Sequence, residues 1–225
     1  MNLLIFDMDG VLVDPTLSYR RALIETVRHF SGKGLRHERI IELKNEGGYN
    51  NDDDLALRIL RDDHGREVEL EEVSEVGERL FWGNNGDGMI LDEQWLVNDG
   101  VLERLAERFR LAVYTGRERR FAEFTLKRFC SHIRFESIMT SCQVQNQKPA
   151  PDGLLKILEA VDKPEALSIG DNIDDARAAK AAGVRFAAVI AEDVPRRDEA
   201  VKLFQSEGAR IIAENVNQIG SFVLR

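Results

Sequence analysis

Hydrophobic and polar positions divide the chain into regions of two kinds. Short, uninterrupted apolar runs such as Leu3–Phe6 occur at the start and recur in the second half, separated by amphipathic helical patterns. Apolar runs of this length are typical of buried parallel strands. Between about residues 15 and 84 the pattern is helical only, as in the spacing of Tyr19, Leu23 and Val27. The pattern therefore predicts an α/β region and an all-helical region.

Strands and helices alternate after residue 88. Beyond the first strand, the runs predict strands over 110–114, 137–140, 166–169, 184–190 and 209–212. Alternation of this kind indicates parallel strands joined by right-handed crossovers. We therefore expect an α/β fold, a doubly wound, Rossmann-like parallel sheet with an inserted small all-helical cap domain.

The helical region interrupts the α/β pattern just after the first strand. The glycine- and asparagine-rich stretch 83–88 is the strongest loop signal in the chain and is typical of a linker. We expect a catalytic core of residues 1–15 and 89–225 and a helical cap of residues 16–88. Hinges are expected at 13–16 and 84–88.

Composition narrows the class of protein. The 225 residues carry a net charge of −9, which argues against a nucleic-acid binder. No apolar run reaches the ~18–20 residues that span a bilayer, and the first residues do not resemble a signal peptide. Only two cysteines are present, too few for a disulfide framework. We expect a cytoplasmic protein with no membrane or nucleic-acid partner; the sequence does not indicate its oligomeric state.

Polar residues follow the predicted strands. Ligands of open parallel sheets bind beyond the carboxyl ends of the strands, so these residues are expected to share one site. Each alone has a simpler explanation as a helix cap, a turn residue or a solvated side chain. The residues are Asp7 and Asp9, then Thr115, Gly116 and Arg117, then Lys148, and finally Asp171 and Asp175.

The charge of such a site predicts a cation. Four aspartates in one cleft would repel one another and raise each other's pKa. One lysine and one divalent cation would offset most of that charge. Oxygen ligands without His or Cys favour Mg²⁺ over Zn²⁺.

Four segments resemble the motifs of the haloacid dehalogenase superfamily in the family's order. They are Phe6–Asp14, Thr115–Arg117, Lys148–Asp152 and Gly170–Asp175. The resemblance spans the whole chain. The helical insertion is similar to the small cap of a subgroup that includes phosphoglycolate phosphatase-like and β-phosphoglucomutase-like members.

The resemblance implies a role for each matching residue. Asp7 would be the nucleophile that forms an aspartyl-phosphate. Asp9 would be the general acid and then the base. Thr115 would hydrogen-bond the phosphoryl group, and Lys148 would neutralise Asp7 and the phosphate oxygens.

The same resemblance implies a Mg²⁺ site. Asp7, the backbone carbonyl of Asp9, and Asp171 would bind the ion directly. Asp175 would bind it through water or orient Lys148. Gly116 and Arg117, in the motif that contains Thr115, are expected to contact phosphate or substrate.

These expectations lead to a function. We expect a Mg²⁺-dependent phosphatase that acts on a small phosphorylated metabolite. A sugar-phosphate mutase and a catalytically idle binding or scaffold protein remain alternatives. Asp9 favours phosphate chemistry, because haloacid dehalogenases lack this second carboxylate.

The loop 44–51 is a candidate for substrate recognition. Lys44 could meet an anionic group, and Asn50 and Asn51 could bind hydroxyls, amides or ring nitrogens. The alternative is a plain connecting loop.

Overall fold

The computed structural model describes residues 2–49, 51–162 and 164–224. The chain forms two compact units, one of Met1–Val13 with Trp95–Arg225 and one of Asp14–Gln94. Two short strands, β2 (Val13–Asp14) and β3 (Gln94–Trp95), pair where the chain passes from one unit to the other. The helical unit is thus an insertion into the α/β unit.

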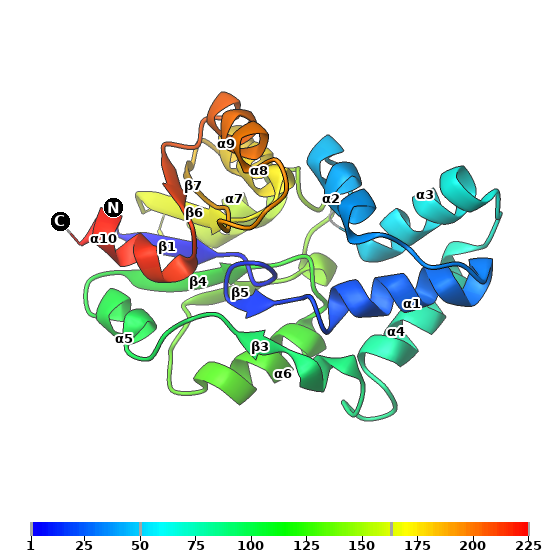
Figure 1. Cartoon of the computed structure of the whole chain (residues 1–225). Helices are drawn as coiled ribbons and strands as arrows, with labels where there is room; N and C mark the ends of the chain where they lie inside the picture. The colour runs from blue at the N-terminus through cyan, green and yellow to red at the C-terminus, as the bar shows by residue number, and fades with distance from the viewer. Residues whose placement is uncertain (1, 50, 163, 225) are drawn as a thin grey trace. The chain divides into compact units, whose positions relative to one another are not determined.

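The α/β unit is built on a six-stranded parallel sheet in the order β5-β4-β1-β6-β7-β8 (Figure 1). The strands are β1 (Leu3–Phe6), β4 (Arg110–Tyr114), β5 (Ser137–Met139), β6 (Ala166–Gly170), β7 (Arg185–Val189) and β8 (Ile211–Ala213). The chain runs outward from β1 to β5 and returns on the other side of β1 with β6. Because the strand order reverses there, the carboxyl end of β1 is where such sheets bind ligands. The predicted doubly wound sheet is confirmed.

Alternate residues of β1 enter two different cores. Leu4 and Phe6 belong to one hydrophobic cluster, and Leu3 and Ile5 to the other; all four are fully buried. The first cluster is covered by α5 (Val101–Ala106), α6 (Arg119–Cys130), the 3₁₀ helix η3 (Val216–Gln218) and α10 (Ile219–Val223). The second is covered by α7 (Asp152–Ala160), α8 (Ile173–Ala182) and α9 (Arg197–Ser206). Burial of each of these side chains contributes about 1.5–3 kcal/mol to the free energy of folding. This packing on both faces of β1 holds in place the strand end that is followed by the polar residues.

The helical unit has a hydrophobic core of its own. The unit consists of α1 (Tyr19–Ser31), α2 (His37–Glu46), α3 (Asp52–His64), α4 (Leu70–Phe81) and the 3₁₀ helix η1 (Met89–Asp92). The apolar stripe predicted from the helical spacing is buried, with Leu23 and Val27 packed against residues of α2 and α3 such as Ile40 and Ile59.

The glycine-rich stretch 83–88 is a compact turn inside the helical unit. The Asn84 amide donates to the Asp87 carboxylate at 2.8 Å, and the Gly88 amide donates to the Trp82 carbonyl at 3.0 Å. Beyond the turn, Ile90 is fully buried and η1 packs against α1 and α4. The chain therefore leaves this unit after residue 94, rather than after residue 88 as the loop signal predicts, and enters it at residue 14 rather than 16.

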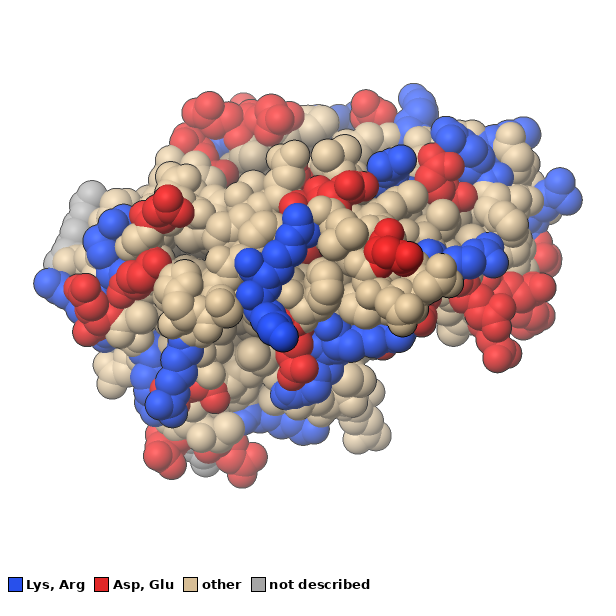
Figure 2. Space-filling model, turned by 90° about the horizontal axis from the view of Figure 1, so that it is seen from below, with Lys and Arg blue, Asp and Glu red and all other residues tan. Residues whose placement is uncertain are grey.

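Charged side chains of both signs are interspersed on the face of the molecule drawn in Figure 2. In the described part of the chain, no helix combines the length and apolarity needed to cross a membrane.

Candidate active site

Lys148 joins three structural elements at the carboxyl edge of the sheet. Its Nζ lies 2.8 Å from Asp7 Oδ1, 2.9 Å from the Tyr114 carbonyl oxygen and 2.6 Å from Asp175 Oδ1. An ammonium has three N–H donors, and these three acceptors use them all. Because the Lys148 side chain is only 3% exposed, it fixes the ends of β1 and β4 and the start of α8 in one arrangement.

Burial and charge act on this cluster in opposite directions. Burial lowers the pKa of Lys148, but Asp175 and Asp7 together outweigh that effect and leave its pKa raised. Burial raises the pKa of Asp7 to about 8; Lys148 opposes the rise, and Asp175, Asp171 and Asp9 add to it. Lys148 is therefore a fixed positive charge, and a single lysine is not enough to keep Asp7 ionised at neutral pH.

Asp175 serves the helix and the site at once. One carboxylate oxygen accepts from the Asn172 amide at 3.1 Å, as half of the capping box that begins α8. The other oxygen meets Lys148. The helix cap and the contact with Lys148 therefore occur together in this residue.

Gly10 makes room for Asp171. Its φ is +76°, and a Cβ placed there would lie 1.9 Å from a carboxylate oxygen of Asp171. A larger residue would strain the backbone and displace Asp171, so the loop after β1 is fitted to the loop after β6.

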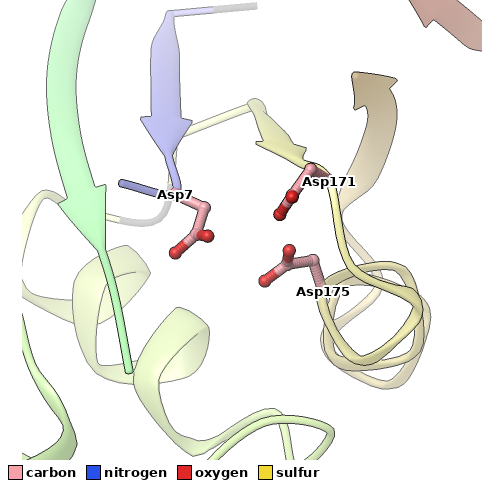
Figure 3. A group of neighbouring side chains, drawn as sticks. All are labelled: Asp7, Asp171 and Asp175. Atoms are coloured by element: carbon pink, nitrogen blue, oxygen red, sulfur yellow. The ribbon is translucent and has the colours of Figure 1, made fainter. Parts of the chain in front are cut away.

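Three carboxylates form a candidate metal site. Asp7, Asp171 and Asp175 each place an oxygen within 4.8 Å of the others. Figure 3 shows them at the end of β1, at the end of β6 and at the start of α8, facing a common space. A set of hard oxygen ligands, with Asp7 disfavoured as an anion on its own, fits a divalent cation such as Mg²⁺.

Asp9 is held by a different cation. Arg117 approaches it in a two-pronged geometry, with Nε 2.9 Å from Oδ2 and Nη2 2.7 Å from Oδ1. The Arg117 side chain is 1% exposed and that of Asp9 is 31% exposed. The sequence groups Asp9 with the other carboxylates, whereas the structure pairs its side chain with an arginine.

Thr115 lies at the end of β4. It is buried, and its hydroxyl oxygen accepts from the Arg117 amide at 3.1 Å. This leaves the hydroxyl proton to be donated. The half-buried Gly116 separates Thr115 from Arg117.

The amino-acid sequence decides the family. A sequence model of haloacid dehalogenase-like hydrolases matches residues 1–183. The chain belongs to this family.

Curated relatives and a solved structure are similar to this chain. This hydrolase is 27% identical over 222 residues to phosphoglycolate phosphatase 1 of Pseudomonas aeruginosa, covering 86% of this chain and 74% of the relative. It is 32% identical over 231 residues to an imidazoleglycerol-phosphate dehydratase of Phytophthora nicotianae, covering 98% of this chain but only 49% of that protein. In fold it is similar to a haloacid dehalogenase-like hydrolase of Streptococcus pneumoniae, with a TM-score of 0.77, 18% identity, and coverage of 99% of this chain and 98% of that one.

Two residues that were expected to bind the substrate instead contact neighbouring residues of the helical unit. Lys44 forms an ion pair with Asp52 at 2.9 Å. Asn51 caps α3, accepting from the Asp53 amide at 2.8 Å. Asn50 lies outside the described residues.

Thr125, Ser141 and the Tyr114 carbonyl belong to the site region but were not predicted from the sequence. Tyr114 accepts from Lys148, Thr125 from Arg117 at 2.9 Å, and Ser141 donates to the Arg117 carbonyl. Thr125 had a visible signal, because it is a polar residue on the apolar stripe of α6 beside Phe121 and Ala122. The other two contacts depend on the fold of the backbone.

Proposed function

We propose that this hydrolase is a phosphatase that removes the phosphoryl group of a small phosphorylated metabolite through an aspartyl-phosphate at Asp7. The observation that carries the proposal is the Lys148 cluster, in which one buried cation holds Asp7 and Asp175 in fixed places at the edge of the sheet. Such a preorganised positive charge stabilises a transferring phosphoryl group.

The reaction would proceed in two steps. A carboxylate oxygen of Asp7 attacks phosphorus, and the bond from phosphorus to the leaving oxygen breaks while Asp9 gives that oxygen a proton. Asp9 then takes a proton from water, whose oxygen attacks phosphorus and releases Asp7. Thr115 would donate its hydroxyl proton to a phosphoryl oxygen, near the Gly116 backbone.

Mg²⁺ is the proposed cofactor. Asp7, Asp171 and Asp175 would hold it, together with the Asp9 backbone carbonyl. When bound, the ion would supply positive charge to the carboxylates and to the phosphoryl oxygens. Residues 14–94 would be the cap that excludes water from the reaction.

A substrate panel tests the proposal. The panel contains p-nitrophenyl phosphate, phosphoglycolate, sugar phosphates, inorganic pyrophosphate, and imidazole-bearing phosphates such as histidinol phosphate. Phosphate release is measured with Mg²⁺ and with EDTA. We expect Mg²⁺-dependent release from at least one compound and none from Asp7→Asn. Activity in that variant would refute the nucleophile, and inactivity of the wild type over the whole panel would favour an idle binding protein.

The same assay separates a phosphatase from a mutase. A mutase would transfer phosphate within a sugar phosphate, depend on a bisphosphate and retain a long-lived phosphorylated Asp7. A phosphatase releases phosphate without a bisphosphate, and this is the outcome that we expect.

A further inference from the structure

We propose that Arg117 is a positioning residue, which holds the Asp9 carboxylate where it transfers a proton to and from the reacting oxygens, and that Thr125 holds Arg117. This inference rests on the proposed role of Asp9 as general acid and base. It assigns Arg117 to Asp9 rather than to the phosphate or substrate.

The contact between Arg117 and Asp9 fixes a plane as well as a distance. Two parallel N–H···O bonds, of 2.9 and 2.7 Å, join the guanidinium to both carboxylate oxygens. Paired bonds of this kind are strong and stop the carboxylate from rotating. Lysine could supply the charge but not this geometry.

The guanidinium itself is anchored on the side away from Asp9. Its Nη1 donates to Thr125 Oγ1 at 2.9 Å, and Thr125 is fully buried on α6. Since the Arg117 side chain is 1% exposed, it points into the protein. The 31% exposed carboxylate of Asp9 is the part of this chain of contacts that can meet a ligand.

The backbone of Arg117 is fixed too. Its amide donates to Thr115 Oγ1 at 3.1 Å, and its carbonyl accepts from the amide and the hydroxyl of Ser141, each at 3.1 Å. Ser141 begins the 3₁₀ helix η2 (Ser141–Gln143) after β5. Arg117 therefore connects the loop after β1 to the residues that follow β4 and β5. Through these contacts the position of the Asp9 carboxylate is fixed relative to the sheet.

Rigid placement matters for a general acid. A proton donor acts only within hydrogen-bond reach of the leaving oxygen, and small misplacements of reacting groups are costly. A poor leaving group, such as an alkoxide, needs that proton more than a good one, such as p-nitrophenolate. Loss of positioning should therefore slow alkyl phosphates selectively, whereas general damage to the fold should slow both substrates alike.

The test compares kcat/KM for an alkyl phosphate from the panel and for p-nitrophenyl phosphate, because kcat/KM reports phosphoryl transfer even where hydrolysis of the intermediate limits kcat. The variants are Arg117→Lys, Thr125→Val, Asp9→Asn and the double variant Arg117→Lys/Asp9→Asn. Thr26→Val is the matched control, since Thr26 is also buried in a helix and its hydroxyl donates to the backbone carbonyl of Ala22, one turn earlier in α1. Circular dichroism and thermal unfolding check the fold of each variant.

We expect Arg117→Lys to lower kcat/KM about 10–100-fold on the alkyl phosphate and less than about 3-fold on p-nitrophenyl phosphate. The loss on the alkyl phosphate is then a part of the ~10²–10⁴-fold rate increase that a general acid provides. Thr125→Val should show the same selectivity at smaller size and carries the test if Arg117→Lys does not fold. In the double variant, Arg117→Lys should cost little beyond Asp9→Asn, because the two act as a unit.

Two results would overturn the inference in distinguishable ways. Equal losses on both substrates in Arg117→Lys and Thr125→Val, with Asp9→Asn selective, would refute positioning and leave the proposed function intact. A non-selective Asp9→Asn would refute the acid role of Asp9 and the inference with it.

Discussion

Replacing Asp7 by asparagine should stabilise the metal-free protein, and the gain should grow as pH rises. Burial raises the pKa of the Asp7 carboxyl from 3.8 to about 8, with a contribution from the neighbouring aspartates. The folded state therefore binds a proton that the unfolded state releases above pH 3.8. Stability associated with Asp7 is complete below that pH and is lost progressively up to about pH 8.

The size of the effect follows from the two pKa values. Between pH 3.8 and about 8 the loss is about 1.4 kcal/mol per pH unit. At pH 7 the interval is 7 − 3.8 = 3.2 units, which gives an upper limit of about 4 kcal/mol. Asp7→Asn removes this titration. The attraction of Lys148 for ionised Asp7 is already contained in the pKa of about 8. Replacing the carboxyl by an amide also changes local hydrogen bonding, so the slope with pH is a sharper observable than the absolute gain.

Urea unfolding in EDTA between pH 5 and 8.5 measures the difference between variant and wild type. Subtraction cancels the titration of groups common to both proteins. Asp193→Asn, a substitution of the same kind at an exposed position, is the control for the loss of one carboxyl group. A flat difference for Asp7→Asn, or one that falls as pH rises, would show that Asp7 is not destabilised by its surroundings.

Three further predictions concern other parts of the chain. Mg²⁺ should raise the Tm of the wild type and raise that of Asp171→Asn less, as thermal unfolding would show; equal shifts would exclude Asp171 from the metal site. Gly153→Ala should lower the free energy of unfolding, measured in urea, by about 1–3 kcal/mol, because its Cβ would lie 2.3 Å from the buried Tyr114 ring. Gly220→Ala is the control: the nearest atom would lie 3.4 Å from its Cβ, and the same measurement should show no loss of stability. Asn51→Ala should lose about 1 kcal/mol of stability with the α3 cap; an unchanged unfolding midpoint would contradict the cap.

Parallel topology explains why much of the site could be predicted from the sequence. The carboxyl ends of parallel strands share one edge, so residues that follow strands in sequence gather in space. Asp7 and Asp175 are 168 positions apart in the sequence (175 − 7). Their carboxylate oxygens nevertheless lie within 2.8 Å of the same atom, Lys148 Nζ. Strand positions alone were sufficient for this prediction.

Pairings within the site could not be predicted in the same way. The order of motifs does not tell which carboxylate receives which cation, because that depends on side-chain direction and reach. Arg117 turns inward to Asp9 and Thr125, although its place beside Thr115 suggested a contact with phosphate. The glycine-rich turn at 83–88 shows a similar limit, since composition marks a loop but not the unit to which the loop belongs.

The pairing of Asp9 also changes the charge balance from which a metal was inferred. Counted with all four aspartates, one lysine and one divalent cation, the site keeps a net charge of −1. In the structure Asp9 is matched by Arg117, which leaves Asp7, Asp171 and Asp175 with Lys148. These four residues carry a formal net charge of −2 when all three carboxyl groups are ionised. One divalent cation then balances the cluster. The same ion would offset the repulsion and desolvation that raise the pKa of Asp7, so the charge that makes the metal-free site unstable is the charge that would bind Mg²⁺.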